Sequence, residues 1–112
     1  MNKTLNKVEL TGYASNPEVL TMKNGGKLFK VSLATHENSK NKNGEWDTET
    51  TWHNVIMWND AAVKAETEIT KGKRIHLMGK LIVNQYTDKD GIKRSAVKIQ
   101  ASEFDLVNED AN

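Results

Sequence analysis

The chain of 112 residues contains no cysteine, a single proline and no long apolar segment. The lack of cysteine excludes disulfide bonds, thiolate metal sites and cysteine nucleophiles, and it is consistent with a reducing cytoplasm. No apolar run approaches the roughly 20 residues that a membrane-spanning helix needs. Residues 1–7 lack the apolar core of a signal peptide. We therefore expect a cytoplasmic protein that makes no contact with a membrane.

Patterns that support catalysis or metal binding are also lacking. His36, His53 and His76 do not have the spacing of metal ligands. The glycine-containing segment 24–27 lacks the spacing of a phosphate-binding loop, and no serine lies in the sequence context of a nucleophile elbow. The sequence therefore predicts no enzyme, no cofactor and no metal site.

The net charge is only +1, but the charges are unevenly distributed. Residues 1–44 carry seven lysines against three acids, and residues 71–98 carry eight basic side chains against two aspartates. Residues 45–68 hold six acids and one lysine, and residues 103–110 hold four acids and no base. If the two basic segments adjoin in the fold, one face is positive, as in nucleic-acid-binding proteins. Ordinary scattered surface charge is the alternative, and the charges alone do not choose between them.

The hydrophobic pattern predicts five strands and one helix. Alternation of apolar with polar residues is typical of strands that are buried on one face. We expect strands at residues 5–13, from residue 28 onward (with Leu28, Val31 and Leu33 apolar), at 49–58, at 74–86 and at 93–107. A helix is expected at 60–70. A helix between the third and fourth of five strands is the order of the OB-fold, a partly open Greek-key barrel. The predicted fold class is therefore all-β with one helix, formed by one domain over residues 1–107.

Turn and capping residues predict where these elements end. Asn24-Gly25-Gly26 and Asp90-Gly91 are hairpin signals. Residues 37–48 are rich in asparagine and serine and predict a polar loop. Asn59 or Asp60 is the expected cap of the helix, which Gly72 is expected to end.

The third predicted strand carries the most informative residues. Period 2 places Trp52, Asn54, Ile56 and Trp58 on one face, and His53, Val55 and Met57 on the other. Both indoles could belong to the core, but a barrel of this size has little room for two of them beside Val55 and Met57. Exposed aromatic rings stack on nucleic-acid bases whatever the base sequence, and lysines in flanking loops neutralise phosphates. The residues themselves thus favour a nucleic-acid-binding function.

Several motifs resemble those of bacterial single-stranded DNA-binding proteins. Asn6-Lys7-Val8-Glu9-Leu10-Thr11-Gly12 with Asn16-Pro17-Glu18-Val19 is similar to the start of that family. Ser32-Leu33-Ala34-Thr35, Asn43-Gly44-Glu45-Trp46 and Thr51-Trp52-His53 resemble its second and third strands and the loop between them. Lys71-Gly72, Gly79-Lys80-Leu81 and Tyr86-Thr87-Asp88 continue the match in order. The resemblance covers nearly the whole chain and implies an OB-fold that binds single-stranded DNA.

The resemblance implies which aromatic residues stack on bases. Trp52 matches a stacking tryptophan, and Trp58 stands where the family usually has a stacking phenylalanine. Tyr86 falls at a further stacking position, usually tryptophan. Ser39 occupies a position where another stacking tryptophan is expected, and Trp46 in the same loop is the candidate to replace it.

The resemblance also assigns polar contacts to the DNA. Phosphate contacts are implied for Lys40, Lys42 and Lys71. Many members have a basic residue at the positions of Asn54, Asn84 and Asp60. Because these three side chains carry no positive charge, we expect the chain to bind DNA more weakly than a typical member does. Asn54 is still expected to contact the DNA.

Family members form homotetramers, as dimers of dimers, so subunit contacts are implied as well. The strand pattern directs Lys7, Glu9, Arg74, His76 and Met78 out of the barrel. His53 and His76 match positions at or near the subunit contacts, the alternative being that both histidines are simply solvated.

Typical members continue beyond the barrel into a flexible linker and an acidic tip that recruits repair and replication enzymes. Here residues 108–112 are expected to be a short acidic end, so recruitment through such a tail is not expected. The implied function is protection of single-stranded DNA in replication, recombination or repair, in the cytoplasm at the nucleoid. The alternative is an OB-fold protein-interaction module of a replication-restart complex, which would not need exposed aromatic residues.

Overall fold

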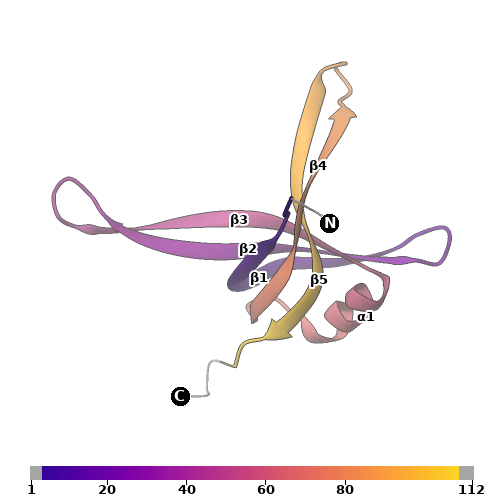
Figure 1. Ribbon diagram of the computed structural model, residues 1–112, viewed down its shortest axis with the longest axis horizontal. Coiled ribbons are helices and arrows are strands. Elements are labelled where there is room, and N and C mark those ends of the chain that lie inside the picture. The colour runs from indigo at the N-terminus through magenta and orange to yellow at the C-terminus, as the bar shows by residue number, and fades with distance from the viewer. Residues whose placement is uncertain (1–3, 109–112) are drawn as a thin grey trace.

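A computed structural model of the protein describes residues 4–108 and contains five strands and one helix in that part of the chain (Figure 1). The elements are β1 (Val8–Thr21), β2 (Lys27–Lys40), β3 (Trp46–Trp58), α1 (Asn59–Glu68), β4 (Arg74–Thr87) and β5 (Lys93–Leu106). The number and order of the elements confirm the predicted fold class. The predicted acidic end falls mostly on residues 109–112, which lie outside the described residues.

The strands form a closed barrel in the order β1-β2-β3-β5-β4. β1 pairs antiparallel with both β2 and β4, and the parallel pair Val55↔Ile99 joins β3 to β5 and closes the barrel. The non-sequential neighbour β5 beside β3 is the Greek-key feature of the OB-fold. The barrel is closed, where the sequence had suggested a partly open one.

Alternating residues of every strand fill the barrel with apolar side chains. The large, fully buried strand residues are Phe29, Leu33, Val55, Met57, Ile75 and Leu77, and Ile69 at the end of α1 is buried with them. Ala62 and Ala65 of α1 are also fully buried, and their small size lets the helix pack closely against β2 and β3. The helix thus closes one end of the barrel and leaves the outer faces of the strands open.

Gly79 allows β4 to bend closely across β5. A Cβ atom at this position would lie 2.7 Å from the Cα atom of Ala101 and even closer to the carbonyl oxygen of Gln100. The ladder between β4 and β5 shifts register between Met78 and Gly79. Glycine at such an irregularity permits the backbone contact that a side chain would prevent.

The β2–β3 and β4–β5 hairpins extend well beyond the barrel in different directions, and the β1–β2 hairpin projects on the side opposite to the β2–β3 hairpin (Figure 1). The length of these hairpins explains the radius of gyration of 16.7 Å, since a compact chain of this size has about 13 Å. We name the first two the β2–β3 arm (residues 35–51) and the β4–β5 arm (residues 80–98). The predicted polar loop at 37–48 is wrong in extent, because most of it forms paired strand from Thr35↔Thr51 to Lys40↔Trp46.

Three further expectations need correction. β1 continues to Thr21 beyond the predicted end, because a register shift between Ser15 and Glu18 accommodates Pro17 and the positive φ of Asn16. The helix begins directly after Trp58, and no side chain caps it. It ends at Glu68, so Gly72, with a φ of +91°, belongs to the following turn.

Leu28, Val31 and Leu33, the apolar positions noted in the second strand, do not all share one face. Phe29, rather than Leu28, points into the barrel with Val31 and Leu33, as the buried core cluster shows. Leu28 lies on the outer side between Leu20 and Trp58 and is also buried. No helix within residues 4–108 is long and apolar enough to span a membrane.

Candidate nucleic-acid interface

The outer face of β2 and β3 carries all three tryptophans. Directly opposed residues of an antiparallel pair lie on the same face, so the register determines which side chains share this surface. The pairs that point outward are Leu28↔Trp58, Lys30↔Ile56, Ser32↔Asn54, Ala34↔Trp52, His36↔Thr50, Asn38↔Thr48 and Lys40↔Trp46. We call this the outer face of β2–β3. It confirms the predicted division of the third strand, with Val55 and Met57 inside the barrel.

The three indoles differ in how much of each ring is available. Trp46 is 67% exposed, Trp52 60% and Trp58 39%. Trp46 stands at the tip of the β2–β3 arm, where the Lys40 ammonium lies 5.3 Å from its ring centroid. Trp58 stands at the other end, opposite Leu28. The rings are spaced six residues apart, about 20 Å at about 3.3 Å per residue, so they can stack on different bases of one strand.

The same surface continues onto β5 and β4. The pair Ile56↔Gln100 places Gln100 on the outer side, and the β4–β5 register extends that side along the second arm. Its pairs are Lys80↔Gln100, Ile82↔Lys98, Asn84↔Ala96 and Tyr86↔Arg94. Tyr86, 52% exposed, therefore belongs to the same continuous surface as the tryptophans.

A shallow depression lies where β2, β3 and β5 meet on this surface. Its volume is about 360 Å³, and Lys30, Ser32, Asn54 and Lys98 contribute to its lining, together with Glu18 of β1, which lies opposite Lys30. Lys30 comes from the first basic segment of the sequence and Lys98 from the second. The fold thus brings together the two segments whose adjacency the charge pattern left open.

The outer pairs of β2–β3 and of β4–β5 contain basic but no acidic side chains, and Glu18 of β1 borders them opposite Lys30. The seven outer pairs of β2–β3 and the four of β4–β5 contain Lys30, Lys40, Lys80, Arg94 and Lys98 and no aspartate or glutamate. Asn54 lies near the middle, opposite Ser32. Aromatic rings interspersed with cations on one surface are the combination that binds single strands.

The turn of the β4–β5 arm is held by Asp88. Its carboxylate accepts hydrogen bonds from the backbone N–H groups of Asp90 (2.9 Å) and Ile92 (3.0 Å) and from Nε of Arg94 (2.9 Å). The Arg94 guanidinium, helped by these N–H groups, holds the pKa of the Asp88 carboxyl below its ordinary value of 3.8. Arg94 is thereby fixed beside Tyr86.

The structure adds three residues to those that the sequence indicated. Lys30 and Lys98 line the depression. Tyr13 lies opposite Ala34, which in turn lies opposite Trp52, so the two aromatic rings flank a small residue on one surface. These three residues come from three different strands, β1, β2 and β5. Alternation within each strand can suggest that one of them faces outward, but it cannot show that they lie together.

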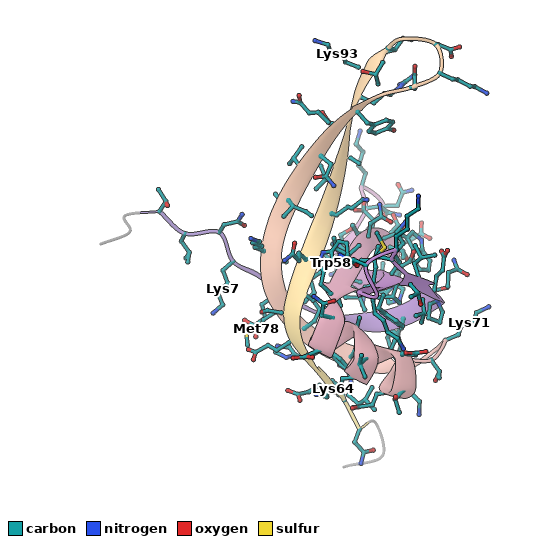
Figure 2. The ribbon with its side chains drawn as sticks, turned by 90° about the vertical axis from the view of Figure 1, so that its right-hand side faces the viewer. Lys7, Trp58, Lys64, Lys71, Met78 and Lys93 are labelled. Carbon is teal, nitrogen blue, oxygen red and sulfur yellow. The ribbon has the colours of Figure 1, made fainter. Side chains whose placement is uncertain are left out.

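Two predicted phosphate-binding lysines lie apart from the rows of outer pairs. Lys42 is exposed in the turn at the tip of the β2–β3 arm, beyond Lys40 and Trp46. Lys71 is in the turn between α1 and β4, where the N–H of Gly72 donates to the carbonyl of Ala14. Figure 2 shows Lys71 projecting on the side of the barrel away from Lys7 and Met78. The structure therefore groups Lys42, but not Lys71, with the tryptophans.

The residues expected at subunit contacts lie mainly on one part of the barrel. Lys7 and Met78 line a common depression and lie on the same side of the molecule (Figure 2). His76 Nε2 lies 2.7 Å from a carboxylate oxygen of Glu9 in the same chain. These four side chains, and the exposed Arg74, point outward from β1, β4 and the segment before β1, as the strand pattern predicts.

His53 occupies a different environment. It lies opposite Leu33 on the inner face of β2–β3 and shares a hydrogen bond of 2.9 Å with the hydroxyl of Thr35. The structure therefore does not place His53 beside His76 in one patch. In the described part of the chain, no three histidine, aspartate or glutamate side chains gather as a metal site.

Comparison with known proteins agrees with this geometry. A model of the single-strand binding protein family matches residues 5–107. The chain belongs to this family. Two single-stranded DNA-binding proteins, from Neisseria meningitidis serogroup A and serogroup B strains, are each 37% identical over 105 residues, or 93% of this chain. The chain spans 60% of the length of these relatives.

Solved structures of single-strand binding proteins have the same fold. A deletion mutant of the single-stranded DNA-binding protein from Thermus aquaticus matches 95% of this chain and 52% of that one, with a TM-score of 0.81 and 25% identity. The Plasmodium falciparum protein in complex with single-stranded DNA matches 96% of this chain and 100% of that one, with a TM-score of 0.84 and 25% identity.

Proposed function

We propose that this member of the single-strand binding protein family binds single-stranded DNA without strong sequence preference. The observation that carries the proposal is the outer surface of β2–β3 and β4–β5, on which Trp46, Trp52, Trp58 and Tyr86 are exposed among basic side chains. The rings stack on bases and the cations neutralise phosphates, so neither interaction reads the base sequence. Family membership and the DNA complex of the Plasmodium falciparum relative support the same conclusion.

Asn54 completes the proposed contact set near the centre of the surface. It lines the depression with Lys30 and Lys98, where its amide can donate to a phosphate or to a base edge. We infer a role in covering single strands during replication, recombination or repair, at the nucleoid in the cytoplasm. Such a function requires no catalysis.

A protein-interaction module of a replication-restart complex is the weaker candidate. Such a module does not need four exposed aromatic rings aligned with cations on one surface. The membership of this chain in the single-strand binding protein family also favours DNA binding over this alternative.

We further propose that the protein forms a homotetramer. The outward residues Lys7, Glu9, Arg74, His76 and Met78 are available on β1, β4 and the segment before β1, and the free face there would allow barrels to stack. Light scattering of the purified protein at several concentrations tests this, and a monomer at every concentration would contradict it.

The binding proposal is tested with a fluorescently labelled oligo-dT and an equally long duplex. Anisotropy should report tight binding of the oligo-dT and weak binding of the duplex, whose stacked bases cannot reach the rings. Equal affinity for both would show that the surface recognises only phosphate charge.

A further inference from the structure

The β2–β3 arm has two faces of opposite character. Its outer face carries Lys40 and Trp46 and no acid, and it continues the face of Trp52 in the barrel. The other face, which we call the acidic back face, is formed by the pairs Thr35↔Thr51, Glu37↔Glu49 and Ser39↔Asp47. It contains three carboxylates, no basic side chain and no aromatic ring. Charge is therefore completely segregated between the two faces of one exposed ribbon.

The acidic back face lowers the stability of the arm. Glu37 and Glu49 lie directly opposite each other, and like charges in that position are destabilising by up to about 1 kcal/mol. Within residues 4–108, no ion pair neutralises either of them or Asp47. The repulsion between these carboxylates therefore destabilises the arm, and no ion pair within the described residues offsets it.

We propose that this arm binds single-stranded DNA on one face only, because the acidic back face repels the phosphates. The inference rests on the proposed function and adds the path of the DNA: from Trp58 past Trp52 to Trp46 at the tip. Since β-ribbons twist, the outer face turns along the arm, and a strand that follows it winds with the ribbon rather than crossing it.

The end of this path is Trp46 with Lys40. The ammonium lies over the indole at 5.3 Å, which places a cation beside the stacking ring where a phosphate would follow the base. Ser39 faces the opposite way, opposite Asp47. An aromatic ring at position 39 would thus stand among carboxylates, whereas Trp46 extends the tryptophan row.

The absence of cysteine from the chain permits a direct test with single introduced thiols. Asn38→Cys places a thiol on the outer face, and Ser39→Cys places one on the back face at the adjacent residue. Both positions are exposed and uncharged. The rate of reaction with a maleimide is measured with and without oligo-dT, using the full chain and DNA at about ten times its Kd.

In the presence of DNA, the outer thiol of Asn38→Cys should react with the maleimide about ten-fold more slowly, because at that DNA concentration only about a tenth of the protein remains unbound. The back-face thiol of Ser39→Cys should react as fast as in free protein. Equal protection of both thiols overturns the proposal. Protection of neither, while anisotropy shows DNA bound, also overturns it, because the arm is then not on the path. Failure to bind DNA at all would instead refute the proposed function.

The role of the carboxylates is tested by neutralising them. With Glu37→Gln, Asp47→Asn and Glu49→Gln added, DNA should also slow the reaction of Ser39→Cys several-fold. The control removes the same number of negative charges away from the arm, with Glu68→Gln, Glu103→Gln and Asp105→Asn. In that background, DNA should not slow the reaction of Ser39→Cys with the maleimide. The same result in both backgrounds would show that the back face does not direct the DNA.

Discussion

Replacing Trp52 by alanine should weaken DNA binding while leaving the fold intact. The indole is 60% exposed and stands opposite the small side chain of Ala34, so it contributes little to the core. Loss of one base stack costs about 1–3 kcal/mol, which corresponds to a rise in Kd of about five-fold to about 150-fold.

Trp58→Ala should differ from Trp52→Ala in a measurable way. Only 39% of Trp58 is exposed, so about 120 Å² of a side chain of about 200 Å² is buried. At 25 cal/mol per Å², and allowing for a compact unfolded state, the buried part stabilises the fold by about 2 kcal/mol. This variant should lose both affinity and stability, because the ring supplies buried apolar area as well as a stacking face.

The two quantities are measured separately for each variant. Titration of labelled oligo-dT gives the Kd, and urea denaturation followed by circular dichroism gives the free energy of unfolding. Val63→Ala, at a half-exposed position of α1, is the control and should change neither. If Trp52→Ala binds oligo-dT as tightly as the unchanged protein, the stacking argument fails.

Three further predictions concern charge, pH and packing. Lys30→Ala and Lys98→Ala, in the central depression, should each lower the slope of log Kd against log salt by about 0.7. Lys64→Ala is the control and should leave the slope unchanged, because the Lys64 ammonium lies over Phe104. Equal slopes in all three variants would contradict the assignment. The pKa of Asp88 is held below 3.8 by Arg94 and by backbone N–H groups. The ionised carboxylate therefore stabilises the turn at residues 88–92 above pH 3.8, and this contribution is lost as the pH falls through the lowered pKa. An NMR titration of Arg94→Ala should show the pKa of Asp88 rising toward 3.8, and an unchanged pKa would refute the role of Arg94. Gly79→Ala should destabilise the fold by about 1–3 kcal/mol through its contact with Gln100 and Ala101, and an unchanged urea midpoint would show that β4 can shift to accept a Cβ.

Much of the fold was predictable because it depends on local signals. Glycine at φ-positive turn positions, such as Gly25 and Gly91, marks hairpins directly, and period 2 marks strands. The alternation in β3 is strict, so its two faces could be assigned before the structure was known. The exposure of Trp52 confirms that assignment.

The arms were harder to predict because their composition resembles that of a loop. Asn38, Ser39 and Asn41 have low strand propensity. The ribbon nevertheless forms, since it continues a ladder that begins in the barrel and pairs with a threonine-rich strand. Extension of an existing ladder can override the local preference of single residues.

The assembled surface could not be predicted from one strand at a time. Whether Tyr13, Lys30 and Lys98 face outward depends on the register across the sheet, and one extra residue reverses the face of everything beyond it. Register shifts occur in both β1 and β4–β5. The sequence does not show where such shifts fall, so these contacts emerged only from the fold.

The central claim is that the exposed tryptophans stack on the bases of single-stranded DNA. It is tested most directly by titrating the unmodified protein with unlabelled oligo-dT while recording tryptophan fluorescence. Two of the three indoles are more than half exposed, so binding should quench the emission strongly and saturably, and added salt should restore it. Unchanged emission at oligo-dT concentrations that saturate binding by anisotropy would contradict the account.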